Sequence, residues 1–71
     1  LDAVLKDETD RRYKDALARL RPEDRELIVG RFELEYSFEQ LALATRRRSP
    51  AAARVALSRA ISRLVDEMGR E

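Results

Sequence analysis

Apolar residues recur every three or four positions along most of the chain, which is the spacing of helices with one buried face. The first clear stripe predicts a helix from about Asp10 to Leu20, with Thr9 or Asp10 as its cap. Its apolar positions are Tyr13, Ala16, Leu17 and Leu20. Residues 1–9 carry little pattern, and we interpret them as a linker or as a short helix that needs a partner surface.

A second helix is predicted to begin at Pro22, because proline is favoured in the first turn of a helix. Acidic residues follow at Glu23, Asp24 and Glu26, where they suit the positive end of the helix dipole. A carboxylate cluster can also serve acid–base chemistry, but the chain has no His to act with it, so we favour the helix-start interpretation.

The same helix carries a predicted buried stripe, with Val29 beside it and partly exposed. The stripe consists of Leu27, Ile28 and Phe32. Residues 33–36 are predicted to connect this helix to a third. Ser37 is a good N-cap, and Gln40 stands three residues on, so the pair predicts a capping box.

The third helix is short, and the fourth is the longest. One face of the third holds Phe38, Leu41, Ala42 and Thr45. Ser49 and Pro50 form a second start signal, and the fourth helix is predicted to end near Gly69. Its buried positions are Ala53, Leu57, Ala60, Ile61, Leu64 and Met68.

A short capped helix, a tight turn and a longer helix together predict a helix-turn-helix within Ser37–Leu64. In that motif the second helix enters the DNA major groove. Small side chains at Ala42 and Ala53 would let the two helices cross closely. The expected fold class is a small all-α domain of four helices without a wing, covering residues 10–71.

Composition adds a charge asymmetry to this picture. The net charge is only +1, but residues 46–71 hold seven basic and three acidic side chains. Thirteen of the fifteen basic residues are Arg, whose guanidinium suits phosphate and guanine edges. Arg is also common in proteins from GC-rich genomes, so composition favours nucleic-acid binding only modestly.

The absence of Cys and His excludes disulfides and the usual zinc, Ser-His and Cys-His sites. We therefore expect no enzyme activity, cofactor, metal or small-molecule substrate. No apolar run approaches the ~20 residues of a membrane span, so a membrane partner is not expected, and the lack of Cys fits a cytoplasmic protein. The chain begins with Leu1 rather than Met, and we expect a missing part upstream.

The exposed face of the fourth helix supplies the candidate base-reading residues. Arg54 and Arg59 could bond guanine, Val55 could pack on a thymine methyl, and Ser58 could meet a base edge or the backbone. Arg63 lies a turn later, where a phosphate contact is expected. The alternative is that these residues only solubilise a helical bundle.

Three pieces of the chain resemble region 4 of sigma-70 family transcription initiation factors, particularly the extracytoplasmic-function (ECF) class. The pieces are ALARLRPEDRELI at Ala16–Ile28, YSFEQLA at Tyr36–Ala42 and SPAAARVALSRA at Ser49–Ala60. Their order and spacing carry the resemblance. The chain departs from the family pattern at Gln40, where an acidic residue is usual, and in a turn one residue longer that lacks Gly. It departs again at Val55 and Ala56, where polar or basic residues are common.

The resemblance implies recognition of the upstream (minus-thirty-five) promoter element by a domain attached to RNA polymerase core. It places base reading at Arg54, Val55, Ser58 and Arg59. Backbone contacts are implied at Ser37, Arg46, Arg47, Arg48, Ser49 and Arg63. The implied protein partners are the flap of the polymerase beta subunit and an anti-sigma factor.

Two alternatives stay open at this point. One is the helix-turn-helix domain of another regulator, such as a LuxR-type output domain, which shares the two-helix core. The helix predicted over Asp10–Leu20 and the LRPEDR pattern favour the sigma-like interpretation. The other alternative is a helical protein-interaction module that does not bind DNA.

Overall fold

The computed structural model describes residues 2–70, with side chains from Asp7 onward, and in this range the chain is helical without any strand. The elements in chain order are α1 (Asp2–Arg19), α2 (Pro22–Ile28), the π-helical segment η1 (Val29–Glu33), α3 (Phe38–Ala44) and α4 (Pro50–Met68). The predicted all-α class with four helices is therefore confirmed.

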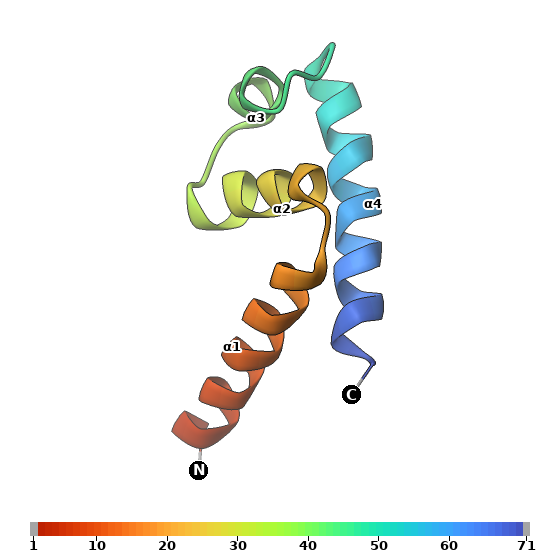
Figure 1. The fold of residues 1–71 in the computed structure, drawn as a ribbon. Coiled ribbons are helices and arrows are strands. Elements are labelled where there is room, and N and C mark those ends of the chain that lie inside the picture. The colour runs from red at the N-terminus through yellow and green to blue at the C-terminus, as the bar shows by residue number, and fades with distance from the viewer. Residues whose placement is uncertain (1, 71) are drawn as a thin grey trace.

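Helix α4 is the element on which the fold is assembled, because α1, α2 and α3 each pack against it. Figure 1 shows α3 beside its first turns, α2 crossing near its middle, and the end of α1 beside its second half. Together the four helices bury one apolar core. Its members are Ala16, Leu17, Leu20, Leu27, Ile28, Leu41, Ala42, Ala53, Leu57, Ala60 and Leu64.

Helix α1 begins earlier than the sequence pattern predicts. It is continuous from Asp2, so the start near Asp10 was wrong, and Thr9 and Asp10 lie inside the helix rather than capping it. Residues 2–9 belong to the segment that the sequence indicates as a linker or as a short helix, and their backbone is helical. Residues 7–12 are all exposed, and this half of α1 projects from the other helices (Figure 1). A helix without a buried face has no apolar period to reveal it.

Helix α2 begins at Pro22 as predicted, but the chain then widens into the π-helical turns of η1. The Leu34 N–H donates to the Val29 carbonyl, five residues back, at 3.0 Å. Because a π turn takes in one residue more than an α turn, residues past Ile28 rotate off the predicted stripe. Phe32 is 57% exposed, so its predicted place in the core was wrong.

Gly30 of η1 packs against the side chain of Leu41 in α3. A Cβ atom at this position would lie 2.8 Å from Cδ1 of Leu41 and 3.1 Å from Cδ2 of Tyr36. Leu41 is fully buried, so its side chain has little room to move aside. The lack of a side chain at Gly30 is therefore what allows this contact between the two elements.

The starts of α3 and α4 follow the predicted capping signals. The Ser37 hydroxyl accepts from the Gln40 N–H at 3.1 Å, and the Ser37 N–H donates to Gln40 Oε1 at 2.9 Å, which completes the capping box. The Ser49 hydroxyl accepts from the Ala52 N–H at 3.1 Å, directly before Pro50. These bonds fix where each helix begins, and so fix which residues of α4 face outward.

Candidate nucleic-acid interface

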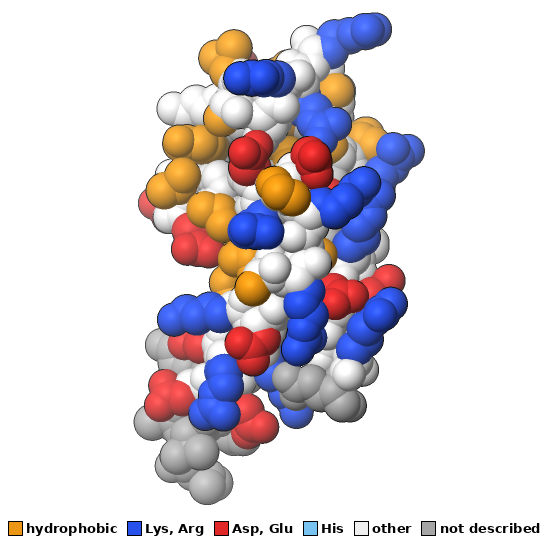
Figure 2. Space-filling model, viewed as in Figure 1, with side chains coloured by type: hydrophobic (Ala, Val, Ile, Leu, Met, Phe, Trp, Pro, Cys, Tyr) orange, Lys and Arg blue, Asp and Glu red, His pale blue; other side chains and the backbone are white. Residues whose placement is uncertain are grey.

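One face of α4 is buried, and the opposite face carries the candidate base-reading residues. Every third or fourth residue from Ala53 to Leu64 is in the core. The side chains of Arg54, Val55, Ser58 and Arg59 are all exposed, as the sequence predicts. In Figure 2 basic side chains follow the right-hand edge of the molecule, where α4 and the turn before it lie.

The two arginines of this set lie on opposite flanks of the exposed face. They are five residues apart, which corresponds to roughly 140° around a helix of 3.6 residues per turn. Arg54 faces α3, while Arg59 lines a cleft shared with the start of α2. Val55 and Ser58 fall between them. The four residues therefore form a strip with a cation at each edge.

The guanidinium of Arg54 packs on the aromatic ring of Phe38. The sequence predicts only that Phe38 lies on one face of the third helix. The guanidinium carbon of Arg54 lies 4.7 Å from the centroid of the Phe38 ring, and that of Arg31 lies 4.3 Å from the same centroid. Both distances are within the range of cation–π attraction. Arg31 also donates from Nη1 to the Tyr36 carbonyl at 2.7 Å. The spacing of Phe38 on α3 gave no signal of this role.

Helix α3 ends in a Schellman arrangement without glycine, and this begins the turn to α4. Arg46 adopts a left-handed backbone with φ of 58°. The Arg47 N–H donates to the Ala42 carbonyl at 2.8 Å, and the Arg46 N–H to the Leu43 carbonyl at 3.4 Å. Glycine usually takes this left-handed position. Arg46, Arg47 and Arg48 are all exposed, so the predicted basic turn is a surface feature beside the start of α4.

The predicted backbone-contact serines both act as helix caps. The hydroxyls of Ser37 and Ser49 each accept a backbone N–H, as described above. A hydroxyl that accepts in a cap still has its own proton to donate. Ser37 is exposed and Ser49 is half-buried, so Ser37 is the more open of the two to a phosphate oxygen.

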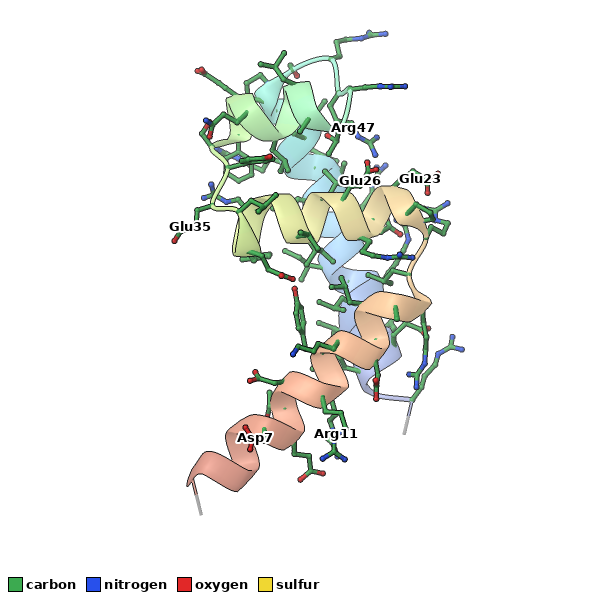
Figure 3. The ribbon with its side chains drawn as sticks, turned by 60° about the vertical axis from the view of Figure 1, so that its left-hand side comes forward. Asp7, Arg11, Glu23, Glu26, Glu35 and Arg47 are labelled. Carbon is green, nitrogen blue, oxygen red and sulfur yellow. The ribbon has the colours of Figure 1, made fainter. Side chains whose placement is uncertain are left out.

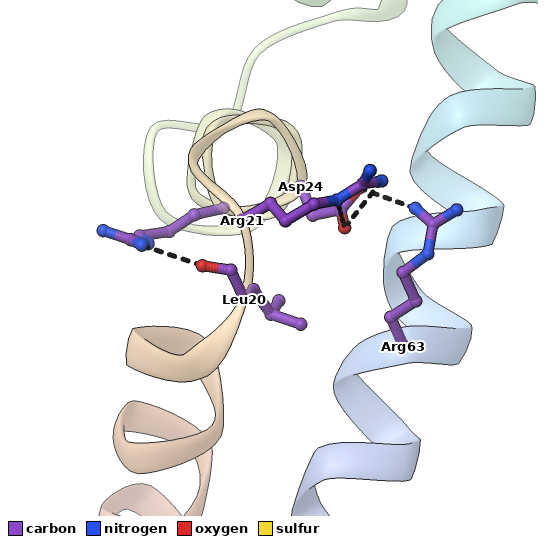
Figure 4. A network of polar contacts seen from close by, with 5 residues as sticks. Leu20, Arg21, Asp24 and Arg63 are labelled. Carbon is purple, nitrogen blue, oxygen red and sulfur yellow. Dashed lines mark hydrogen bonds and ion pairs between the residues drawn. The ribbon is translucent and has the colours of Figure 1, made fainter.

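Arg63 differs from the other predicted backbone contacts because it is already paired inside the protein. It donates from Nη1 to Oδ1 of Asp24 at 2.8 Å, and Arg21 approaches the other carboxylate oxygen at 3.5 Å (Figure 4). The Asp24 side chain is 4% exposed. Asp24 lies in the first turn of α2, as predicted, but its larger role is to join α2 to α4.

A cleft of about 290 Å³ lies beside this network, between the start of α2 and the middle of α4. Three of its lining residues, Arg47, Arg59 and Arg63, are predicted DNA contacts. Arg21 also lines the cleft, and no sequence pattern singles it out. The full lining consists of Arg21, Glu23, Asp24, Arg47, Ala56, Arg59 and Arg63. Figure 3 shows Arg47 reaching from the turn toward α2, where Glu23 lies.

Metal-ligand groups and membrane-spanning helices are absent from the described part of the chain. Residues 7–70, whose side chains the structure describes, hold no group of three or more acidic, Cys or His side chains placed to bind a metal ion. No helix within residues 2–70 combines the length and apolar character needed to cross a membrane. A scan against protein-family models, a search of curated proteins and a search of solved structures each found no match to this chain.

Proposed function

We propose that this chain is a sequence-specific DNA-binding domain of the helix-turn-helix type, with α4 as the helix that enters the major groove. The observation that carries the proposal is the strip Arg54–Val55–Ser58–Arg59, exposed on a helix whose opposite face is anchored in the core. The cap at Ser49 and the packing of α3 fix the rotation of that strip. A rigid, outward-facing strip is what direct reading of base edges requires.

The chemistry of the strip suits the major groove. A guanidinium can bond to O6 and N7 of guanine in two parallel hydrogen bonds, and Arg54 is the residue best placed for this because Phe38 supports it. Val55 is 52% exposed and offers an apolar surface for a thymine methyl. The Ser58 hydroxyl can donate to or accept from a base edge.

Backbone contacts are proposed on the residues that surround the strip. Ser37 and the turn residues Arg46–Arg48 are exposed next to the starts of α3 and α4. Arg63 would add positive charge even while it is bonded to Asp24, because its side chain is 47% exposed. Such contacts position a protein on DNA without reading its sequence.

Within this function we propose a narrower role, which is recognition of the minus-thirty-five promoter element as region 4 of an ECF-class sigma factor in the bacterial cytoplasm. The order and spacing of the three sequence pieces support it. A second support is an exposed apolar pair, because Phe32 and Leu34 are 57% and 55% exposed in and just after η1. Large exposed apolar side chains are available to a protein partner, and a beta flap or an anti-sigma factor would cover them.

The DNA-binding proposal is tested by selecting duplexes that the chain retains from a random-sequence pool. We expect an enriched motif, and we expect Arg54→Ala to weaken binding to that motif by roughly 1–3 kcal/mol and to random duplex by less. Arg11→Ala is the matched control, because Arg11 is exposed on the projecting half of α1 (Figure 3). Failure to enrich any motif would refute sequence-specific binding.

The sigma-factor role needs a separate test, because any helix-turn-helix regulator could pass the first. Immobilised chain is expected to retain a purified beta flap of bacterial RNA polymerase, and Phe32→Ser is expected to reduce retention while Arg54→Ala leaves it unchanged. Both side chains are exposed, so neither change should unfold the domain. Motif enrichment without flap retention would reject the sigma role and favour a stand-alone regulator.

A further inference from the structure

The cleft between the start of α2 and the middle of α4 gathers four arginines from three separate parts of the chain. Arg21 precedes α2, Arg47 comes from the turn, and Arg59 and Arg63 come from α4. Only two acidic residues, Glu23 and Asp24, share the lining. At neutral pH the cleft therefore carries a net positive charge, and it has room for a small anion.

The four arginines are not equivalent. Asp24 pairs with Arg21 through Oδ2 and with Arg63 through Oδ1 (Figure 4). Arg47 and Arg59 have no ion pair with any residue in the described part of the chain. The cations of the cleft without an ion pair are therefore these two side chains, one from the turn and one from α4, and Glu23 is the one lining carboxylate without an ion pair in the described part of the chain.

A phosphate group is the ligand that matches this arrangement. Guanidinium groups bind phosphate oxygens in paired, charge-assisted hydrogen bonds, and two arginines approaching from different elements can bind two different oxygens. Asp24 acts as a positioning residue, because it limits how far Arg21 and Arg63 can swing into the cleft.

The position of the cleft favours a phosphate that belongs to DNA. Arg59 lies on both the cleft and the exposed strip of α4, on the flank opposite Arg54. A helix in the major groove has one DNA strand on each side. Arg59 lies on the flank of α4, and its charged end is in the cleft. From there it would face the DNA backbone rather than a base.

We propose that this cleft holds one phosphate of the DNA backbone, bound directly by Arg47 and Arg59. The inference rests on the proposed DNA-binding function and sharpens it in two ways. Arg59 becomes a backbone contact, so that base reading is left to Arg54, Val55 and Ser58. Arg21, which the sequence interpretation did not single out, becomes part of the interface.

The test replaces single phosphates of a selected duplex with neutral methylphosphonate, one position at a time. We expect one position at which the neutral linkage weakens binding roughly tenfold, as for loss of a charge-assisted bond. Arg47→Ala and Arg59→Ala should each lose part of this factor on the unmodified duplex and should be less sensitive to the neutral linkage at that one position, and the double variant should be insensitive to it. Arg11→Ala and Arg48→Ala should retain full sensitivity there, because neither residue lines the cleft.

The outcomes separate this inference from the function on which it rests. Arg47→Ala and Arg59→Ala could still weaken binding on every duplex with a single neutral linkage. In that case the cleft does not hold a phosphate, and the DNA-binding proposal stands. If the chain binds no duplex, both proposals fail. A parallel titration with inorganic phosphate, followed by NMR of the guanidinium groups, tests whether the cleft binds free phosphate instead. Saturation of Arg47 and Arg59 by free phosphate, without any coupled DNA position, would overturn the assignment to DNA.

Discussion

Arg63 and Asp24 join the middle of α4 to the first turn of α2 through a bond of 2.8 Å from Nη1 to Oδ1. The carboxylate is nearly inaccessible to water, whereas the arginine is half exposed. This asymmetry matters because a buried carboxylate without its partner is much more costly than an exposed guanidinium without one. The pair therefore fixes the orientation of α2 against the helix that carries the proposed reading strip.

Removing the arginine of this pair should weaken the fold. We expect Arg63→Ala to lower the free energy of unfolding by about 2 kcal/mol, because Asp24 would keep only the longer contact to Arg21. Arg59→Ala removes the same charge from the same helix but breaks no ion pair of the described residues, so its change should stay within about 0.5 kcal/mol. Urea denaturation of both variants measures the difference. Equal stabilities would mean that the pair contributes nothing to the fold.

Gly30 provides a second test of packing. Its added methyl group would meet Leu41 at 2.8 Å, inside the core, so we expect Gly30→Ala to destabilise the protein by roughly 1–3 kcal/mol. Gly69→Ala is the matched control, because the nearest atoms there are 3.6 Å away and the backbone is in the right-handed helical region. Thermal denaturation should separate the two variants, and a harmless Gly30→Ala would contradict the close contact between η1 and α3.

Helix starts were predictable from the sequence where a local signal marks them. Pro22, Ser37 and Ser49 each act through neighbouring residues only, and each helix begins where expected. The early start of α1 was not predictable, because residues 7–12 are exposed on the helix and leave no periodic apolar stripe. The exposure of Phe32 was missed for a different reason, since the stripe assumed a regular α-helix and η1 is wider.

The turn before α4 stores strain at Arg46. A left-handed backbone costs a residue with a side chain roughly 1–2 kcal/mol, so Arg46→Gly should raise the free energy of unfolding by about 1 kcal/mol. Arg48→Gly removes the same charge from the same turn, but Arg48 has no positive φ, and the added chain freedom should lower stability by about 0.5 kcal/mol. Opposite signs in urea denaturation would support the described turn, and a loss in both variants would contradict it.

Tyr13 couples α1 to η1 in a manner that pH can probe. Its hydroxyl donates to Glu33 Oε2 at 2.9 Å. Burial, followed by this hydrogen bond and the charge of Glu33, raises the pKa of Tyr13 from 10.0 to about 12. The folded state therefore keeps a proton that the unfolded chain loses. The resulting stabilisation is complete below pH 10.0 and disappears as the pH rises to about 12.

The Tyr13 prediction can be measured by phenolate absorbance. The chain has two tyrosines, so Tyr36→Phe leaves Tyr13 as the only one that titrates. We expect its pKa near 12 in that variant, and a lower value when Glu33→Gln is added. An ordinary value near 10.0 without the second change would show that the contact between α1 and η1 does not form in solution.

The candidate site was only partly readable from the sequence. Periodicity on α4 was enough to place Val55 and Ser58 outside, because the rotation of a single helix follows from its own residues. The support of Arg54 by Phe38 and the engagement of Arg63 by Asp24 depend on how separate helices pack. Such contacts between distant parts of the chain leave no signature in local spacing.

The central claim is that the α4 strip and the basic turn before it bind DNA, and the salt dependence of binding tests it most directly. Fluorescence anisotropy of a labelled duplex selected by the chain gives the association constant between about 50 and 200 mM salt. About five neutralised phosphates predict a slope of log K against log salt near −4 to −5. No binding, or binding that does not change with salt, would contradict the account.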